Sequence, residues 1–168
     1  MHRVKICQGD ITQLHVDVIV NATDYGLAVG NGASDAFRRA AGNEFEHACE
    51  AIGYCPIGEV RVTPGFRLAA NIIIHKVGSA WRGGEHREEQ LLASCYQRAM
   101  IEAKKHNVKS IAFPAFSCGE LGFPARRAIK IAIAEVNSAL CQNLLLETVV
   151  FCCFDPVTAA LYRNQIGK

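Results

Sequence analysis

A three-layer α/β/α sandwich, with one sheet covered by helices on both faces, is the fold class that this sequence predicts. Short runs of β-branched and aromatic residues alternate along the chain with segments whose apolar residues recur at helical spacing. The strand-like runs are apolar almost throughout, which is typical of strands that are covered on both faces. With 168 residues, 50% of them hydrophobic, the chain suits one ordinary core, so we expect a single domain over residues 1–168.

Six segments are expected to form strands, because each is a short apolar run rich in β-forming residues. In chain order they are RVKIC (3–7), VDVIVNA (16–22), EVRVTPG (59–65), NIIIHKVG (71–78), KSIAFPA (109–115) and ETVVFCCF (147–154).

Three helices are expected among these strands. The segment SDAFRRAAG is predicted to begin near Ser34 and to end at Gly42, where a glycine suits a C-terminal cap. The segment REEQLLASCYQRAMIEAKKH (87–106) carries apolar residues at helical spacing among charged ones. The helix that Pro124 opens has an apolar stripe made of Ile129, Ala132, Ile133, Val136 and Leu140.

Composition argues against several classes of function. Lys and Arg total 18 and Asp and Glu total 16, so the net charge of +2 provides no strong signal for binding nucleic acid. The N-terminus MHRVKICQGD lacks the apolar core of a signal peptide, and the longest apolar runs are too short to span a bilayer. We therefore expect a cytoplasmic protein with no membrane partner. The eight cysteines lack zinc-site spacing and are interpreted mainly as small core residues, so neither a metal nor a cofactor is expected.

Two glycine-containing loops, each between a predicted strand and a predicted helix, are the main functional signal. The first, YGLAVGNG (25–32), precedes the helix that begins near Ser34, and the second, SCGELGF (117–123), precedes the helix that Pro124 opens. Glycine lets the backbone approach a ligand closely, and the free amides of a helix start can bind an anion. Two such loops at the ends of neighbouring strands can hold a pyrophosphate from both sides, although each alone is compatible with a simple turn.

Two familiar phosphate motifs do not fit this sequence. GNGASD lacks the third glycine of G-x-G-x-x-G because Asp35 stands there, and no Gly-Lys-Ser/Thr tripeptide occurs. Backbone amides would therefore bind the phosphates with little help from lysine. Asp10 in QGDIT is a further polar candidate, either as an acceptor for the exocyclic amine of adenine or as a cap for the turn that Gly9 starts.

Seven segments in a fixed order carry a resemblance to a known family. They are QGDIT, VDVIVNATD, RRAAG, IIIHKVGSAWRGGE, LLASCY, SIAFPAFSCGELGFP and the late pair Phe154–Asp155. On these segments the chain resembles the macrodomains over nearly its whole length, and it is most similar to the bacterial single-domain branch related to the MacroD type. The resemblance implies a mixed central sheet and a cleft for ADP-ribose or a related nucleotide. It also suggests an ADP-ribosylated protein as a second kind of partner.

The resemblance further implies roles for residues of both loops and of two other strand ends. Asp10 would accept the adenine amine, Ile11 would contribute its backbone, and Phe154 would pack beside the adenine. The two loops would bind the diphosphate and the distal ribose. The implied ligand-binding residues are Asp10, Ile11, Asn21, Gly30, Asn31, Gly32, Ala33, Ser117, Cys118, Gly119, Glu120, Leu121, Gly122, Phe123, Phe154 and Asp155.

The chain departs from the MacroD-type pattern at both of its principal catalytic positions. The segment Asn-Ala-Ala-Asn is NATD (21–24) here, and Ser34 replaces the aspartate of Gly-Gly-Gly-Val-Asp-Gly. Asp24 accepts hydrogen bonds but cannot donate them, and it places a negative charge near the pyrophosphate. The lost carboxylate can be replaced by Asp24 or by Asp35, so the candidate catalytic residues are Asp24, Ser34 and Asp35. Equally, Ser34 and Asp35 can simply cap the helix.

The second loop departs from the family pattern as well. Family members usually carry a threonine at Cys118, a small apolar residue at Glu120 and an aromatic residue at Leu121. Glu120 adds a carboxylate near the phosphates, whereas Leu121 removes an aromatic lid over the distal ribose. Cys118 stands beside a helix start, a setting that favours a thiolate, but no histidine is placed as its base.

Three functions from different classes follow from these observations. The first is binding of ADP-ribose or ADP-ribosyl groups without turnover, and it is the one we expect. The second is a hydrolase that removes mono-ADP-ribose from proteins or deacetylates O-acetyl-ADP-ribose. The third is an interaction protein that has kept the fold and lost the nucleotide.

Overall fold

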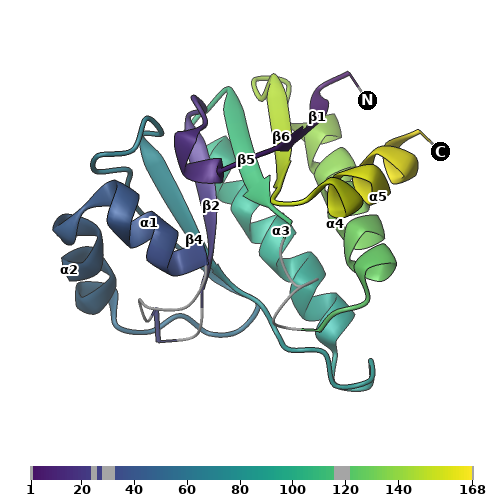
Figure 1. Cartoon of the computed structure of the whole chain (residues 1–168), viewed down its shortest axis with the longest axis horizontal. Helices are drawn as coiled ribbons and strands as arrows, with labels where there is room; N and C mark the ends of the chain where they lie inside the picture. Colours follow the sequence, from purple (N-terminus) through teal and green to yellow (C-terminus); the bar gives the residue numbers. More distant parts are fainter. Residues whose placement is uncertain (1, 24–25, 28–32, 116–121, 168) are drawn as a thin grey trace.

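The computed structural model describes residues 2–23, 26–27, 33–115 and 122–167, and all six expected strands are present in it (Figure 1). They are β1 (Val4–Gln8), β2 (Val18–Thr23), β3 (Val60–Pro64), β4 (Ile72–Val77), β5 (Ser110–Pro114) and β6 (Thr148–Cys153). The helices are α1 (Ala33–Ala41), α2 (Asn43–Ile52), α3 (Glu88–Lys105), α4 (Ala125–Gln142), α5 (Pro156–Ile166) and the short 3-10 helix η1 (Ile11–Gln13).

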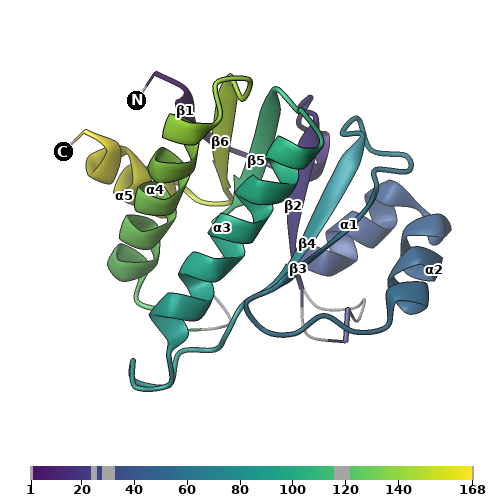
Figure 2. The same ribbon diagram turned by 180° about the vertical axis from the view of Figure 1, so that it is seen from behind.

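The strands form one mixed sheet in the order β1-β6-β5-β2-β4-β3. Neighbouring strands are parallel except at β3, which pairs antiparallel with β4. Helices α1 and α2 cover one face of the sheet (Figure 1), and α3 and α4 cover the other (Figure 2). The predicted three-layer α/β/α sandwich with a mixed central sheet is confirmed.

Two apolar clusters, one on each face of the sheet, hold the layers together. The first joins strand residues such as Val20, Ile111 and Phe151 to α3, α4 and α5. The second joins strand residues such as Ile19 and Ile73 to α1 and α2. Successive side chains of a strand point to opposite faces, so both faces are apolar only if the strands are apolar throughout, as the sequence shows. Within the described ranges, no helix is long and apolar enough to span a membrane.

Two helices were not expected from the sequence. Gly42 ends α1 as predicted, because its N–H donates to the carbonyl of Arg38 at 2.9 Å. With a φ of 93°, however, the same glycine turns the chain directly into α2. Helix α5 begins with Pro156 in its first turn and is capped by Asp155, which accepts from the N–H of Thr158 at 2.8 Å. An acidic cap followed by proline is a helix-start signal that the sequence does contain.

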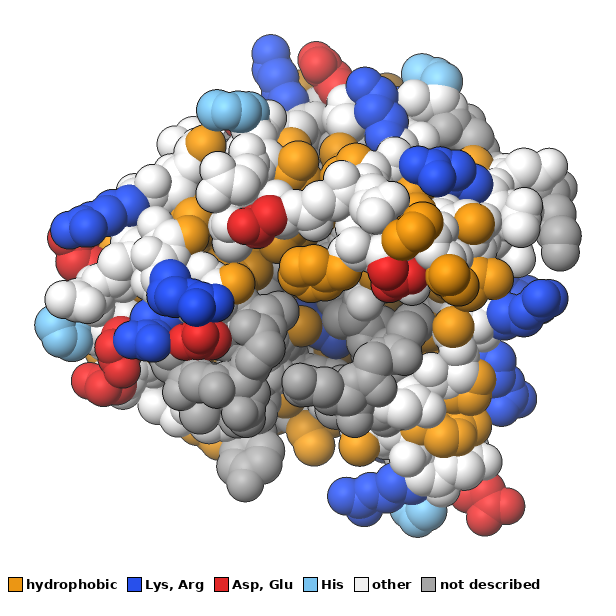
Figure 3. All heavy atoms as spheres, in the orientation of Figure 1, with side chains coloured by type: hydrophobic (Ala, Val, Ile, Leu, Met, Phe, Trp, Pro, Cys, Tyr) orange, Lys and Arg blue, Asp and Glu red, His pale blue; other side chains and the backbone are white. Residues whose placement is uncertain are grey.

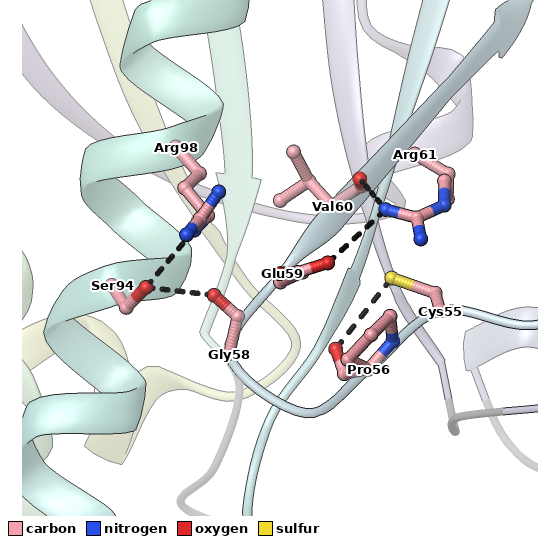
Figure 4. Close-up of polar contacts among 8 residues, drawn as sticks. All are labelled: Cys55, Pro56, Gly58, Glu59, Val60, Arg61, Ser94 and Arg98. Atoms are coloured by element: carbon pink, nitrogen blue, oxygen red, sulfur yellow. Dashed lines mark hydrogen bonds and ion pairs between the residues drawn. The ribbon is translucent and has the colours of Figure 1, made fainter.

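The edge strand β3 is tied to α3 by polar contacts just before it begins (Figure 4). Ser94 Oγ donates to the carbonyl of Gly58 at 2.8 Å, and Arg98 Nε donates to Ser94 Oγ at 3.3 Å. Gly58 has a φ of +86°, and a Cβ there would lie 2.9 Å from Leu91 Cδ2. Glycine therefore allows the chain to approach α3 closely where β3 starts.

Replacing Phe151 by alanine is expected to destabilise the fold strongly. The ring is fully buried, and its centroid lies 4.8 Å from that of Tyr162 and 6.0 Å from that of Phe113. Loss of a buried phenyl ring leaves a cavity, so we expect the free energy of unfolding in urea to fall by about 3–5 kcal/mol.

The control for this prediction is Leu144→Ala, because the Leu144 side chain is 85% exposed. We expect that variant to change the free energy of unfolding by less than about 0.5 kcal/mol. Similar losses in the two variants would contradict the place of Phe151 in the core.

Candidate functional site

The candidate site lies where two neighbouring parallel strands stop pairing. Strands β2 and β5 share only two register pairs, Val18 with Ile111 and Ile19 with Ala112. Beyond them, β2 continues to Thr23 in register with β4, and β5 continues to Pro114 in register with β6. The two strands therefore part before they reach their carboxyl ends.

The chain leaves these two ends toward opposite sides of the sheet. From β2 it passes through α1 and α2 to β3 and β4, and from β5 it passes through α4 to β6. Open α/β sheets bind ligands at such a switch point, outside the carboxyl ends of the strands. The two glycine-containing loops predicted from the sequence are the connections that leave β2 and β5. The structure thus places the starts of both connections at one edge of the sheet.

Several predicted site residues within these connections lie outside the residues that the structure describes. They are Asp24, Gly30, Asn31, Gly32, Ser117, Cys118, Glu120, Leu121 and Gly119. Their predicted roles stay predictions.

The first connection ends in the first turn of α1, where Ala33, Ser34 and Asp35 lie. The helix begins at Ala33, so Ser34 lies inside it and not at the N-cap position that the sequence suggested. The Asp35 carboxylate pairs with Arg38 at 2.9 Å and with Arg39 at 3.5 Å. The hydrogen bond from Arg38, together with the positive charges of both arginines, lowers the pKa of Asp35. In this conformation its carboxylate is held on the surface of α1.

The second connection ends at Gly122 and Phe123, directly before α4. Gly122 has a φ of 67°, in the region that favours glycine. Phe123 is buried, and its ring lies 4.8 Å from the ring of Trp81. Pro124 occupies the N-cap position of α4, and no side chain among the described residues caps the helix there. The first-turn amides of a helix can bind an anion, so the start of α4 is a candidate phosphate-binding position.

The residues predicted to contact adenine lie together on neighbouring strand ends. Asp10 and Ile11 follow β1, Phe154 and Asp155 follow β6, and these strands pair as far as Gln8 with Cys153. Phe154 is 66% exposed, whereas Ile11 is buried. Asp10 Oδ1 accepts from the N–H of Thr12 at 2.9 Å and from its hydroxyl at 2.7 Å. The capping role proposed for Asp10 is thus present, and its contact to adenine stays a prediction.

Asp155 acts as the N-cap of α5 and accepts from both the N–H and the hydroxyl of Thr158. These hydrogen bonds lower the pKa of the Asp155 carboxyl group. Its local role is therefore to start α5 beside Phe154, and a contact to the ligand stays a prediction.

Asn21 belongs to a buried polar chain that crosses three strands. Its Nδ2 lies 3.2 Å from Nδ1 of His75, and Nε2 of His75 lies 2.8 Å from Oγ1 of Thr63. Because an amide NH₂ can only donate, Nδ1 of His75 accepts and its Nε2–H donates to Thr63. The Thr63 hydroxyl then donates to the carbonyl of Pro64 at 3.1 Å. His75 thus makes hydrogen bonds within the core through both ring nitrogens.

Burial lowers the pKa of His75 to about 4, so the ring is neutral at physiological pH. The orphan atoms of this region are Asn21 Oδ1 and Thr23 Oγ1, which are buried and lack a hydrogen-bond partner within the residues described. Both belong to the last half of β2, the part of the strand that has parted from β5. Polar atoms left in this state are typical of a site that binds water or a ligand.

The sequence analysis missed the loop between β4 and α3 as a neighbour of this site. Trp81 lies in this loop, and its ring packs on Phe123. Glu88, which had no assigned role, is fully buried at the start of α3. Sequence signals for this arrangement are weak, because a buried glutamate looks like any other acidic residue in the first turn of a helix.

Comparison with known proteins shows the family to which the chain is similar. Residues 20–132 match the family model of the Macro domain. The chain is 41% identical over 166 residues to a macro domain-containing protein from Methanosarcina mazei, covering 99% of this chain and 89% of that protein. It is 43% identical over 170 residues to an O-acetyl-ADP-ribose deacetylase from Salmonella typhimurium, covering 99% and 95%.

Two solved structures are similar in fold and carry nucleotides. The Oceanobacillus iheyensis macrodomain with ADP has a TM-score of 0.90 and 34% identity, covering 96% of this chain and 88% of that one. The Trypanosoma brucei macrodomain in complex with ADP-ribose has a TM-score of 0.91 and 30% identity, covering 98% and 69%.

The buried chain around His75 predicts a loss of stability in mild acid. In the unfolded chain His75 takes up a proton near pH 6.5, whereas in the folded protein it does so only near pH 4. The folded state therefore loses stability as the pH falls from 6.5 to 4. Between about pH 7.5 and about pH 5 this linkage is worth about 2 kcal/mol in the free energy of unfolding.

Urea unfolding at both pH values, with wild type and His75→Gln, measures this linkage. Glutamine can still accept and donate hydrogen bonds but does not titrate. The decrease in the free energy of unfolding between the two pH values should therefore be smaller in the variant than in the wild type, by about 2 kcal/mol. Parallel pH profiles for the two proteins would show that folded His75 titrates normally.

Proposed function

Because the chain belongs to the macrodomain family, we propose that it binds ADP-ribose, or an ADP-ribosyl group on a modified protein, at the edge where β2 and β5 part. The observation that carries this proposal is the switch point itself: two neighbouring parallel strands separate there, and both glycine-containing connections leave from it. The nucleotides in the two similar macrodomain structures support the choice of ligand.

The described residues suggest which part of the ligand would lie at each position along this edge. The amides of the first turn of α4 would donate to the diphosphate, with the helix dipole adding a favourable charge. Asp10 would accept from the adenine amine, and the exposed ring of Phe154 would pack beside the base. Among basic side chains, Arg38 and Arg39 are already paired with Asp35, so the site depends on main-chain donors.

Deacetylation of O-acetyl-ADP-ribose is the second candidate, favoured by the 43% identity to a protein with that name. Ester hydrolysis needs a base that takes a proton from the attacking water and returns one to the departing ribose oxygen. Ser34 cannot supply a carboxylate, and Asp35 is a weakened base because its arginine partners lower its pKa. Asp24 is therefore the residue that would carry this chemistry, whereas the binding function requires no base.

The kind of protein partner is inferred from the ligand, and the cellular location is inferred from the sequence. An ADP-ribosylated protein as partner is inferred from the ligand alone, because a bound ADP-ribosyl group can be attached to a side chain. A cytoplasmic location stays a prediction from the N-terminal sequence and the unpatterned cysteines.

Asp24→Asn is expected to tighten the binding of ADP-ribose. A carboxylate about 6 Å from the diphosphate repels it by on the order of 3 kcal/mol at an effective dielectric constant of about 20, so removal of the charge gains up to about a hundredfold in affinity. Isothermal calorimetry with ADP-ribose measures both proteins.

The matched control for this charge change is Glu147→Gln, because Glu147 is exposed and precedes β6 at the opposite edge of the sheet. Its dissociation constant should equal that of the wild type. The absence of binding heat with wild type and Asp24→Asn would refute nucleotide binding and favour a pure interaction protein.

We expect the wild type to bind without turnover, because the two principal catalytic positions are changed. Product release from O-acetyl-ADP-ribose and from a mono-ADP-ribosylated protein, followed by chromatography, tests this expectation. Multiple turnovers that disappear in Asp24→Ala but persist in Asp35→Ala would replace the binding function by the hydrolase and assign the base to Asp24. The reverse pattern would assign it to Asp35.

A further inference from the structure

The loop between β4 and α3 is built around one buried carboxylate. Glu88 Oε1 accepts from the N–H groups of Arg82 at 2.9 Å and Gly84 at 3.3 Å, and Oε2 accepts from the N–H of His86 at 2.8 Å. The side chain is 0% exposed. Alternate N–H groups of the loop thus donate to one carboxylate, which belongs to the first turn of α3.

The carboxylate remains ionised in this buried position. Burial by itself raises the pKa of Glu88, but the hydrogen bonds from its own N–H and from those of His86, Arg82 and Gly84 outweigh burial and lower the pKa to about 2. Charge-assisted hydrogen bonds of this kind are among the stronger ones in proteins. The loop backbone is therefore held by a charge that is present throughout the physiological range.

The fixed loop places Trp81 against the start of α4. The ring centroid of Trp81 lies 4.8 Å from that of Phe123, at an interplanar angle of 56°. The guanidinium carbon of Arg127 lies 5.4 Å from the centre of the same ring, and Arg127 also pairs with Glu89 at 3.1 Å. A Cβ on Gly84 would lie 2.9 Å from the edge of Trp81, so glycine allows the loop to close on the ring.

This arrangement connects Glu88 to the proposed ligand site through packed side chains. Phe123 directly precedes the N-cap residue of α4, so its position sets where the first turn of that helix begins. Figure 2 shows the loop beside the N-terminal end of α3, at the same edge of the molecule where α4 starts. Trp81 is only partly buried, so part of its side chain is accessible to solvent.

Resting on the proposed function, we propose that Glu88 and Trp81 are positioning residues of the nucleotide site: Glu88 orders the loop through its amides, and Trp81 then holds Phe123 at the start of α4. Glu88 does not contact the ligand in this proposal. It acts on the site only through the loop that it orders. The phosphate-binding end of α4 is thereby set in place before the ligand arrives, which reduces the entropy lost on binding.

Glu88→Gln tests the first link of this proposal. A glutamine side chain has one acceptor oxygen and an NH₂ group, so it cannot accept from the amides on both sides of the carboxylate. We expect the dissociation constant for ADP-ribose, measured by calorimetry at neutral pH, to rise by about tenfold or more as the start of α4 loses its support. Circular dichroism verifies that the variant is folded.

Glu147→Gln is the matched control, because it makes the same charge change on an exposed side chain just before β6, which takes no part in the contacts of Glu88, Trp81 or Arg127. Its dissociation constant should stay within about twofold of that of the wild type. Trp81→Phe and Trp81→Ala test the second link: phenylalanine keeps an aromatic contact to Phe123 and should restore most of the affinity that alanine loses.

The fluorescence of Trp81, the only tryptophan of the chain, provides a readout that stability alone would not move. We expect ADP-ribose to shift the emission of the wild type and of Glu147→Gln, and the shift to be reduced in Glu88→Gln. Folded Glu88→Gln and Trp81→Ala that bind ADP-ribose as tightly as the wild type would overturn the inference and leave the proposed function intact. A wild type that gives no binding heat would refute both.

Discussion

The site depends on one feature of the hydrogen bonding of the sheet: β2 and β5 stop pairing with each other before their carboxyl ends, and the connections that follow them lead to opposite faces. Their shared register stops at Ile19 and Ala112, after which each strand pairs only with its outer neighbour. Main-chain groups that face the gap need partners other than a ladder. Helices α1 and α4 are the first α-helices after β2 and β5, so the connections that enter both helices start at this same edge.

A site made of main-chain donors agrees with the charge of the protein. The net charge is only +2, and on the face in Figure 3 acidic and basic side chains are interspersed around the periphery while apolar side chains occupy much of the middle. Recognition of a diphosphate by amides and helix dipoles needs no concentration of lysine, and it is less sensitive to salt than a patch of exposed cations. Asp24 and Glu120 oppose this arrangement by adding negative charge to the same connections.

Two buried titratable groups near the site differ in charge, because His75 is neutral and Glu88 is ionised. In both, the hydrogen-bond partners decide whether the cost of burying a charge is offset. His75 contacts an amide and a hydroxyl, which satisfy a neutral ring but do not offset the cost of burying a cation. Glu88 receives several backbone N–H groups, which stabilise an anion more than burial destabilises it. The neutral chain holds the end of β2 and the ionised acid holds the loop beside α4, so the two groups support the two halves of the edge.

The sequence by itself determined the strands, the layers and the two glycine-containing connections, because strand burial and glycine spacing are local patterns that a chain carries in its residue order. It also identified Asp10 and Phe154 as residues at strand ends, since both follow apolar runs. Only the tertiary structure decided that β2 and β5 part and that the ring of Trp81 packs on Phe123. These features depend on strand order and on contacts between segments far apart in the chain, and neither hydrophobic periodicity nor motif spacing records which segments become neighbours in space.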